Sequence, residues 1–456
     1  MKLKIKEMAA ILNAPIQNEA DVFITNTTFD SRQATENSLF VPLVADNDGH
    51  NYIAAAQAQG ASVALWQADH ADVPTDMPVI IVPDTLAAYQ QLASHYLDQI
   101  NPLVVAVSGS NGKTTTKDFI AAIGQQKYRT VKTPENFNNE IGVPQTILSM
   151  PDDTELLVIE IGMDHPGDLD FLSKLVKPDI ALLTMIGEAH IEFFKTRERI
   201  ADGKMEIING LKENGHLVFN GDEPLLNERV AQHATLNNDS FGLNSTNDLF
   251  ASEIDMTPLQ ASFITNQSSQ RFTIPLTGKY NIANALAAIT VGHLLKIEDE
   301  QIANTLAAAP ITENRTEWLA GNFGGKILSD VYNSNPTAAK EVLRFFAEVP
   351  TDGERFAVIG DMLQLGEASA ALHASVADSL DPDKIQHVYL VGEEIAPLED
   401  VLRDIYPAGS VKRYAIADQE TLLKDLLNDL SANDMIMLKG SHGVHLENIV
   451  KQLKAN

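Results

Sequence analysis

Leu103-Val-Val-Ala-Val-Ser108, followed directly by Gly109-Ser-Asn-Gly-Lys-Thr-Thr115, is the stretch of sequence that decides the fold. The apolar run Leu103–Val107 is typical of a strand that is buried on both faces of a parallel sheet. Beyond the Gly-rich segment, Phe119, Ile120 and Ile123 recur at helical spacing. A strand, a Gly-rich turn and a helix in this order are the context that a phosphate-binding loop requires.

The phosphate-binding loop is predicted to consist of Gly109, Ser110, Asn111, Gly112, Lys113, Thr114 and Thr115. Its backbone N–H groups and the N-terminus of the following helix would bind the phosphates of ATP. Lys113 would reach the β- and γ-phosphates, and the Thr114 hydroxyl would bind Mg²⁺. The common pattern has a Gly at the position of Val107, so this loop is a shorter variant. A Gly-rich turn that binds nothing is the alternative, and the flanking strand and helix argue against it.

Similar apolar runs recur after the loop, with helical patterns between several of them, at Leu156–Ile159, Ile180–Thr184 and Leu217–Asn220. Strands that alternate with helices predict a mainly parallel sheet. The polar stretch 237–247 and then Phe250–Pro275 predict a β-rich excursion, and a helical pattern after Asn281 closes the region. We therefore predict a central ATP-binding domain over residues 84–310.

Two further α/β units flank the central one, and 456 residues are enough for about three domains. Residues 1–83 contain short β-rich runs at Val22–Thr27, Leu39–Leu43, Ala61–Trp66 and Val79–Val82. Residues 311–456 contain four more predicted strands, at Lys326–Ser329, Arg355–Ile359, His387–Val391 and Met435–Leu438. The predicted fold class is α/β, with a small N-terminal domain, a central parallel sheet of the phosphate-loop ATPase type and a C-terminal Rossmann-like domain.

The composition limits the functions that are open to this chain. With 62 acidic and 33 basic residues its formal net charge is −29, which argues against nucleic acid as the main partner. Cys is absent, so disulfides, thiolate metal sites and a Cys nucleophile are excluded. No apolar run has the length of a signal-peptide core or a membrane helix. We expect a cytoplasmic monomer without membrane insertion.

Segments in all three regions resemble, in the same order, those of the Mur ligases, which form amide bonds in peptidoglycan precursor synthesis. The segments are Phe29–Arg32 with Leu39–Val41, Thr133–Pro144, Glu160–Asp168, Leu276–Ala288, Asp330–Pro336 and Gly360–Glu367. The second, third and last of these look like segments of the family member that adds D-alanyl-D-alanine. The shorter phosphate-binding loop also resembles that of the Mur ligases.

The resemblance implies an ATP-dependent ligase that joins D-alanyl-D-alanine to UDP-N-acetylmuramoyl-tripeptide. The N-terminal domain would bind the UDP portion, and the C-terminal domain would bind the dipeptide and close over ATP. A substrate carboxylate would attack the γ-phosphate of ATP and form an acyl phosphate, and the dipeptide amine would then displace phosphate. Positioning and cations would carry most of the catalysis, because the first step brings two anions together.

Three residues are expected to act with Lys113 in catalysis. Glu160 ends a buried strand near the loop, and its carboxylate is a predicted Mg²⁺ ligand together with Thr114. The resemblance implies that His190, which follows the next strand, helps to hold a second metal ion, and that Lys204 is carbamylated. The alternatives are a solvated acid, a structural or solvated histidine and an ordinary exposed lysine.

Other polar residues are expected to bind the substrates. For ATP they are Asn281, Asn284, Arg315 and Asp330, and for the UDP-linked tripeptide and the dipeptide they are Ser31, Arg32, Asn138, Asn139, Asn333 and Asn335. Asn138 and Asn139 would orient the acceptor carboxylate or the γ-phosphate, unless they only form a turn. Asn281 could instead cap its helix, and Arg315 could belong to a surface ion pair.

Several rival interpretations are open at the level of sequence. Another ligase of the same superfamily, adding the third amino acid or acting on folate, would share the mechanism. A phosphate-loop kinase or a non-catalytic ATP-binding scaffold would not form an amide. The third residue of the acceptor peptide and the choice between D-alanyl-D-alanine and D-alanyl-D-lactate are also open. Since three domains would contribute to one site, we expect the angles between them to change when ligands bind.

Overall fold

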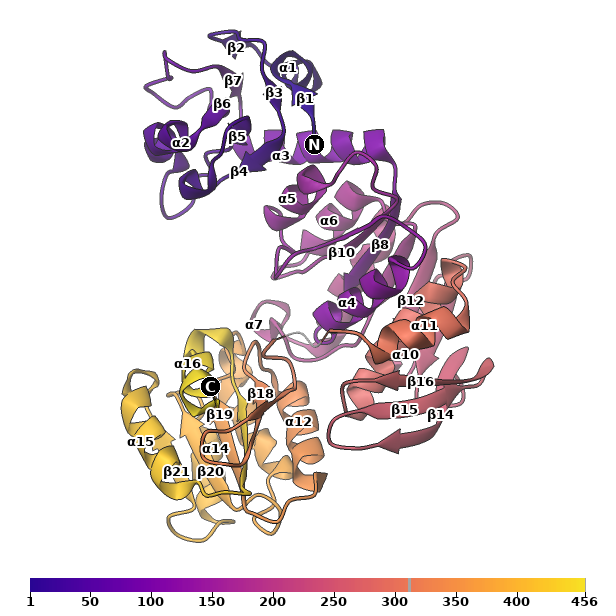
Figure 1. Ribbon diagram of the computed structural model, residues 1–456, viewed down its shortest axis with the longest axis vertical. Helices are drawn as coiled ribbons and strands as arrows, with labels where there is room; N and C mark the ends of the chain where they lie inside the picture. The colour runs from indigo at the N-terminus through magenta and orange to yellow at the C-terminus, as the bar shows by residue number, and fades with distance from the viewer. Residues whose placement is uncertain (311–312, 456) are drawn as a thin grey trace.

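The computed structural model describes residues 1–310 and 313–455, which form three sheet-based domains that follow one another along the chain (Figure 1). The predicted α/β fold class is therefore confirmed. Ile311, at which the C-terminal domain was predicted to begin, lies outside the described residues. None of the helices described is long and apolar enough to cross a membrane.

The N-terminal domain is built on a sheet in the order β2-β7-β6-β5-β4, in which only β2 is antiparallel to its neighbour. Its elements are β1 (Leu3–Lys4), α1 (Ile5–Leu12), β2 (Ile16–Gln17), β3 (Phe23–Ile24), β4 (Asn26–Thr28), η1 (Ser31–Gln33), β5 (Ser38–Phe40), η2 (Gly49–Tyr52), α2 (Ile53–Gln59), β6 (Ala61–Gln67) and β7 (Val79–Val82). The predicted run Val22–Thr27 is divided between two sheets, because β3 pairs with β1 whereas β4 pairs with β5. The helix α3 (Thr85–Ile100) packs on both α1 and α5 and so connects this domain to the next.

The central sheet has the order β16-β15-β14-β13-β12-β11-β8-β10-β9. Its strands are β8 (Leu103–Ser108), β9 (Thr130–Lys132), β10 (Leu156–Glu160), β11 (Ile180–Leu183), β12 (His216–Asn220), β13 (Asn237–Gly242), β14 (Leu249–Met256), β15 (Ala261–Thr265) and β16 (Ser268–Ile274). Its helices are α4 (Lys113–Gly124), α5 (Gly142–Ser149), α6 (Asp168–Val176), α7 (Ile191–Phe194), α8 (Arg197–Met205), η3 (Glu206–Gly210), α9 (Pro224–Val230), α10 (Lys279–Leu294) and α11 (Asp299–Ala307). The predicted excursion Phe250–Pro275 is the antiparallel part β14–β16, whereas the polar stretch before it supplies β13, a parallel strand of the main sheet.

The strand β8 lies between β10 and β11 because both of its faces are apolar. Val104 and Ala106 belong to the hydrophobic core that includes α5 and α6, and Val105 and Val107 belong to the core that includes α4 and α10. Burial on both faces explains why the run has no polar alternation. The parallel register places the carboxyl ends of these strands side by side, with Glu160 opposite Val107.

The C-terminal sheet has the order β17-β18-β22-β19-β20-β21, and only β17 is antiparallel to its neighbour. Its elements are β17 (Glu317–Ala320), β18 (Lys326–Asp330), α12 (Pro336–Glu348), β19 (Arg355–Gly360), η4 (Gly366–Ala368), α13 (Ser369–Ala374), η5 (Ser375–Ser379), β20 (His387–Val391), α14 (Ala396–Arg403), β21 (Val411–Tyr414), η6 (Ile416–Asp418), α15 (Gln419–Asp429), β22 (Met435–Lys439), η7 (His442–Val444) and α16 (Glu447–Leu453). The four predicted strands are confirmed. The two that were not predicted, β17 and β21, are edge strands of four residues each.

Candidate active site

A cavity of about 790 Å³ lies where the central and C-terminal domains meet, at the carboxyl ends of β10 and β18. The predicted site residues that line it are Ser110, Asn111, Gly112, Lys113, Thr114, Thr115, Asn138, Asn139, Glu160, His190, Lys204, Asn281, Asn284, Arg315, Asp330 and Asn333. Side chains that are far apart in the sequence are thus brought to one place. Four predicted residues, Gly109, Asn335, Ser31 and Arg32, are not among its lining residues.

Two glycines give the phosphate-binding loop its shape. Gly109 has φ +142° and Gly112 has φ +82°, values that side chains rarely allow. A Cβ atom on Gly109 would lie 1.9 Å from Thr184 Oγ1, and one on Gly112 would lie 2.4 Å from Asn284 Oδ1. Gly112 is also the N-cap of α4. The first N–H groups of α4, which have no partner within the helix, therefore lie at the cavity.

Lys113 and Lys204 place two amines in the interior of the site. Lys113 Nζ donates a 2.9 Å hydrogen bond to Gly109 O, and Lys204 Nζ donates one of 3.4 Å to Ser108 Oγ. Burial lowers the pKa of both lysines, and the positive charge of Lys113 helps to lower the pKa of Lys204 well below its ordinary value. Desolvated amines of this kind favour an incoming anion, in spite of the negative net charge of the chain. Lys204 lies on α8 and is 2% exposed, so the alternative of an ordinary exposed lysine is wrong.

Glu160 is held through both of its carboxylate oxygens. Oε2 accepts a 2.9 Å hydrogen bond from Thr114 Oγ1, and Oε1 accepts one of 2.8 Å from Asn138 Nδ2. The carboxyl group is 2% exposed, so Glu160 is not a solvated acid. A buried carboxylate beside a hydroxyl oxygen is the donor chemistry that Mg²⁺ prefers. The residues present therefore fit a magnesium ion at this position.

His190 precedes α7 in a left-handed conformation, with φ +63°. Its Nδ1 lies 3.1 Å from Asp164 Oδ1 without the alignment of a hydrogen bond. Burial lowers the pKa of His190 to about 4, although the carboxylate of Asp164 acts in the opposite direction. The imidazole is therefore neutral near pH 7, which is the form that binds metal ions.

The asparagine pairs Asn138–Asn139 and Asn281–Asn284 of the central domain make different hydrogen bonds. Asn139 Oδ1 accepts hydrogen bonds from Ile141 N and Gly142 N, so this residue forms the turn that begins α5, whereas Asn138 orients Glu160. On α10, Asn284 Nδ2 donates to Asn281 Oδ1 at 3.2 Å. The N-cap of α10 is Gly278, so the alternative that Asn281 caps its helix is wrong. Both α10 amides are buried beside the loop helix, to which Thr116 Oγ1 links Asn284 by a 3.3 Å hydrogen bond.

The C-terminal wall of the cavity carries one ion pair within its own domain and an arginine that lies over an aromatic ring. Asp330 Oδ2 lies 2.6 Å from Lys439 Nζ, and Asp330 Oδ1 accepts a 3.1 Å hydrogen bond from Thr316 N. Lys439 Nζ also donates to Asn333 O at 3.0 Å. The Arg315 guanidinium lies 4.1 Å from the centre of the Tyr332 ring, and within the described residues it has no ion-pair partner. The alternative of a surface ion pair therefore does not describe Arg315.

Asn335 joins the C-terminal domain to the phosphate-binding loop. Its Nδ2 donates to Asn111 Oδ1 at 2.8 Å, and Asn111 Nδ2 donates to Asn335 Oδ1 at 3.2 Å. Asn335 Oδ1 also accepts a hydrogen bond from Ala338 N and caps α12. Close by, Glu188 accepts hydrogen bonds from Thr337 N and Thr337 Oγ1. In this arrangement Asn335 makes an interdomain contact instead of lining the cavity.

Ser31 and Arg32 lie on η1 in the N-terminal domain, apart from the cavity. The Arg32 side chain is 87% exposed and pairs with Asp30 through two of its nitrogens. Hydrogen bonds from Arg32 lower the pKa of Asp30 to about 2. The role of these residues in binding UDP stays a prediction.

Several lining residues were not among the predicted site residues, and Lys439, Asn220 and Tyr332 are three of them. Lys439 ends β22 and Asn220 ends β12, so the position directly after a buried parallel strand was the available signal. Tyr332 supports Arg315 through its ring, and the sequence carries no pattern that indicates this contact.

Comparison with known proteins places this site in a family. A model of the Mur ligase middle domain matches residues 107–292, and one of the Mur ligase, glutamate ligase domain matches residues 314–442. UDP-N-acetylmuramoyl-tripeptide–D-alanyl-D-alanine ligase of Bacillus subtilis (strain 168) is 36% identical to this chain, over 99% of the chain and 98% of that protein.

Solved structures agree with this comparison. A crystal structure of MurF from Acinetobacter baumannii matches with a TM-score of 0.90 and 26% identity, and it covers 99% of both chains. The structure of MurF ligase from Thermotoga maritima in complex with ADP matches with a TM-score of 0.81 and 28% identity, over 93% of this chain and 96% of that one.

The chain belongs to the Mur ligase family, and it is an ATP-dependent ligase. Within the family its similarity is to the UDP-N-acetylmuramoyl-tripeptide–D-alanyl-D-alanine ligases, which confirms the resemblance inferred from the sequence.

Proposed function

We propose that this chain joins D-alanyl-D-alanine to UDP-N-acetylmuramoyl-tripeptide, with ATP converted to ADP and phosphate. The observation that carries the proposal is the single cavity to which both domains contribute. The central domain supplies the phosphate-binding loop, Glu160 and Lys204, and the C-terminal domain supplies Arg315 and Asp330. The full-length similarity to ligases of that name supports the choice of substrates.

In the first step the terminal carboxylate of the tripeptide attacks the γ-phosphorus of ATP, and the bond from that phosphorus to the β–γ bridging oxygen breaks. Lys113 and the N–H groups at the start of α4 would bind the phosphate oxygens, so that repulsion between the two anions is reduced. Asn138 keeps Glu160 in one orientation beside Thr114. The chain thus supplies position and charge, which are the main requirements of phosphoryl transfer.

Thr114 and Glu160 would hold Mg²⁺, and His190 would contribute to a second metal position. Bound there, Mg²⁺ would neutralise charge that develops on the phosphates. Lys204 would act as a carbamate, because burial lowers the pKa of its amine and so favours the neutral form, which is the form that reacts with CO₂. The product would be an additional carboxylate facing the metal positions.

In the second step the dipeptide amine attacks the acyl carbon, the bond to phosphate breaks, and the amine loses a proton. Asn333 would lie on the dipeptide side, and closure of the interdomain cavity would protect the acyl phosphate from water. Ser31 and Arg32 would hold the UDP portion at the far end of this long substrate, the guanidinium by charge-assisted hydrogen bonds to diphosphate. Because both nucleotide substrates belong to the interior of the cell, we place the enzyme in the cytoplasm. We propose that it acts as a monomer.

Phosphate release from ATP tests this proposal. It should require both UDP-N-acetylmuramoyl-tripeptide and a dipeptide, and the product mass should equal the sum of the two minus one water. Tripeptides that end in lysine or in a diamino acid, offered with D-alanyl-D-alanine or D-alanyl-D-lactate, determine the preferred pair. Phosphate release that is independent of both substrates would refute the ligase activity.

Domain movement provides a separate test. The pair Asn111–Asn335 connects the phosphate-binding loop to the C-terminal domain directly. Phosphate bound on the loop would therefore either break these hydrogen bonds or bind beside them. We expect small-angle X-ray scattering to change when an ATP analogue and the UDP-linked substrate are added together. An identical scattering curve with and without ligands would contradict the proposed closure.

A further inference from the structure

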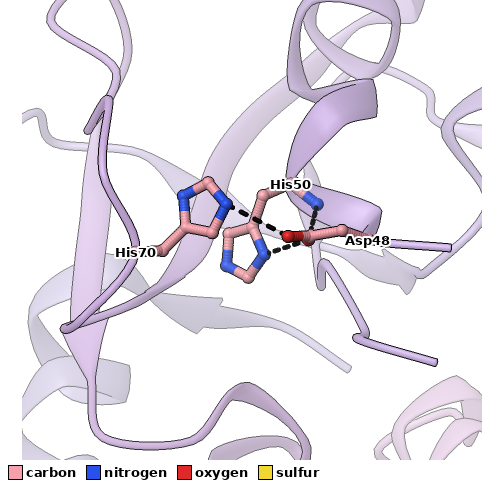
Figure 2. Close-up of side chains that lie close together, drawn as sticks. All are labelled: Asp48, His50 and His70. Carbon is pink, nitrogen blue, oxygen red and sulfur yellow. Dashed lines mark hydrogen bonds and ion pairs between the residues drawn. The ribbon is translucent and has the colours of Figure 1, made fainter.

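A second group of metal-binding side chains lies in the N-terminal domain. Asp48, His50 and His70 offer one carboxylate oxygen and two imidazole nitrogens, all within 4.8 Å of one another. Asp48 and His50 lie at the start of η2, and His70 follows β6, so the three side chains converge from two segments (Figure 2). We infer that Asp48, His50 and His70 bind a divalent transition-metal ion of the Zn²⁺ class.

The hydrogen bonds of His70 leave one ring nitrogen available at Asp48. Its Nδ1 lies 2.7 Å from Ala71 O, and since a carbonyl oxygen only accepts, Nδ1 carries a proton. In the neutral ring Nε2 therefore presents a lone pair, 3.1 Å from Asp48 Oδ2. A lone pair and a carboxylate oxygen at this distance require a cation, which is either a second proton or a metal ion. Donation of the other N–H to a backbone carbonyl is the usual arrangement of a metal-bound histidine.

His50 approaches the same carboxylate from the interior of the domain. Its side chain is fully buried, and its Nδ1 lies 2.7 Å from Asp48 Oδ1. Gln67 N donates a hydrogen bond to His50 Nε2, but at 3.3 Å this bond is long. Metal binding through Nδ1 would move the ring proton to Nε2, so it would replace both the hydrogen bond from Gln67 N and the one from Nδ1 to Asp48 Oδ1. The His50 and His70 rings are stacked at 4.2 Å, so both are already placed beside Asp48.

The donor set indicates which ions would bind. Two imidazole nitrogens and one carboxylate suit Zn²⁺ and similar ions, whereas Mg²⁺ prefers oxygen ligands alone. The side chains of Asp48 and His70 are 31% and 27% exposed, which leaves a coordination position open to water. In the described part of the chain the ion pairs of Asp48 are with these two histidines, so no lysine or arginine occupies the position. A bound ion would tie the turn 45–49 to the end of β6.

Titration of Zn²⁺ into the full chain, in buffer with excess Mg²⁺, tests the inference. We expect His70→Ala to lower the affinity of one Zn²⁺ site by roughly 100-fold or more, since even residues behind the ligands change affinity 10–100-fold. The matched control is His293→Ala, which removes a histidine from a 2.7 Å pair with Asp299. Within the described residues this pair has no third metal-binding side chain, so the variant should bind Zn²⁺ as the wild type does. Zn²⁺ that binds near Glu160 and His190 would be common to all of these proteins and would cancel in the comparison.

Co²⁺ absorption gives a second readout. The wild type should show the visible bands of a site with few ligands, and Asp48→Asn should lose them while its circular dichroism stays unchanged. Equal Zn²⁺ stoichiometry and affinity in the wild type and in a folded His70→Ala variant would overturn the inference. In that case the cluster is an ion pair between Asp48 and a protonated His70.

Discussion

The two walls of the cavity are charged in different ways. On the central wall Lys113 and Lys204 are desolvated amines whose hydrogen bonds go to uncharged oxygens, and burial lowers the pKa of both. On the C-terminal wall Asp330 and Lys439 neutralise each other at 2.6 Å. The two central amines thus have no ion-pair partner within the described residues, whereas the pair Asp330–Lys439 of the C-terminal wall is already neutral. Substitutions in the first should mainly reduce activity, and substitutions in the second should mainly reduce stability.

Lys113→Met is expected to have the largest effect. The amine would no longer meet the phosphates, and loss of one such stabilising group costs about 10²–10³-fold in kcat, so we expect at least this loss in phosphate release. Because a desolvated amine is removed, the free energy of unfolding should stay unchanged or increase. Lys127→Met, which removes a lysine that binds Leu295 O and Lys296 O away from the cavity, is the control. Unchanged phosphate release in Lys113→Met would show that the central wall does not act through this charge.

The next prediction concerns carbamylation of Lys204, which would add a carboxylate to the central wall. If Lys204 is carbamylated, depletion of CO₂ should reduce phosphate release, and bicarbonate should restore it. Lys204→Ala should lose roughly 10²-fold in kcat and should not respond to bicarbonate. Lys212→Ala, which removes an amine paired with Asp179 outside the cavity, is the matched control and should behave as the wild type. Mass analysis that finds only an unmodified amine, together with activity that is insensitive to CO₂, would rule out the carbamate.

The C-terminal wall is tested by removing one member of its ion pair. Lys439 is 2% exposed, so Asp330→Asn leaves a buried cation without its partner, and this should cost about 3–5 kcal/mol in the free energy of unfolding. The double variant Asp330→Asn with Lys439→Met should recover much of that loss, because neither charge is then buried alone. Urea unfolding of the single and double variants measures both effects. Equal stability of Asp330→Asn and the wild type would show that this wall is not held by the pair.

The parts of the central wall that could be predicted from the sequence are those with strong local signals. β8, the loop and α4 carry strong local signals, because burial on both faces gives an uninterrupted apolar run and the turn requires glycine. Glu160 could be predicted from its place at the end of a parallel strand. The edge strands β17 and β21 carry a weaker signal, since each has only four residues and both include charged side chains, Glu317 in β17 and Lys412 and Arg413 in β21.

Contacts between domains could not be predicted from local sequence. Asn111 and Asn335 are 224 positions apart, and their reciprocal amide pair depends on how two domains are placed. The burial of Lys204 could not be predicted either, because the helix Arg197–Met205 is rich in charged residues, a composition typical of an exposed helix. Only the packed structure shows that this helix turns its lysine toward the loop.

Low pH should reduce the free energy of unfolding through His190 on the central wall, and this effect should be smaller than those above. Burial lowers the pKa of His190 from 6.5 to about 4, so between these values the unfolded chain binds a proton that the folded chain does not. Stability therefore falls as the pH drops through this window, and it rises as the pH increases. His190→Asn should lose less stability on acidification, on the order of 2 kcal/mol less, at about 1.4 kcal/mol per pKa unit.

Asn is the substitution of choice because it tolerates the left-handed conformation of His190. Urea unfolding at pH 7 and pH 4.5, with a chelator to remove divalent ions, measures the difference. His165→Asn, which removes a neighbouring imidazole that is 61% exposed, is the control for the loss of one histidine. If the wild type and His190→Asn lost stability in parallel, the neutral imidazole would not be a property of the folded site. The desolvated amines of Lys113 and Lys204 would then be the groups that distinguish the central wall.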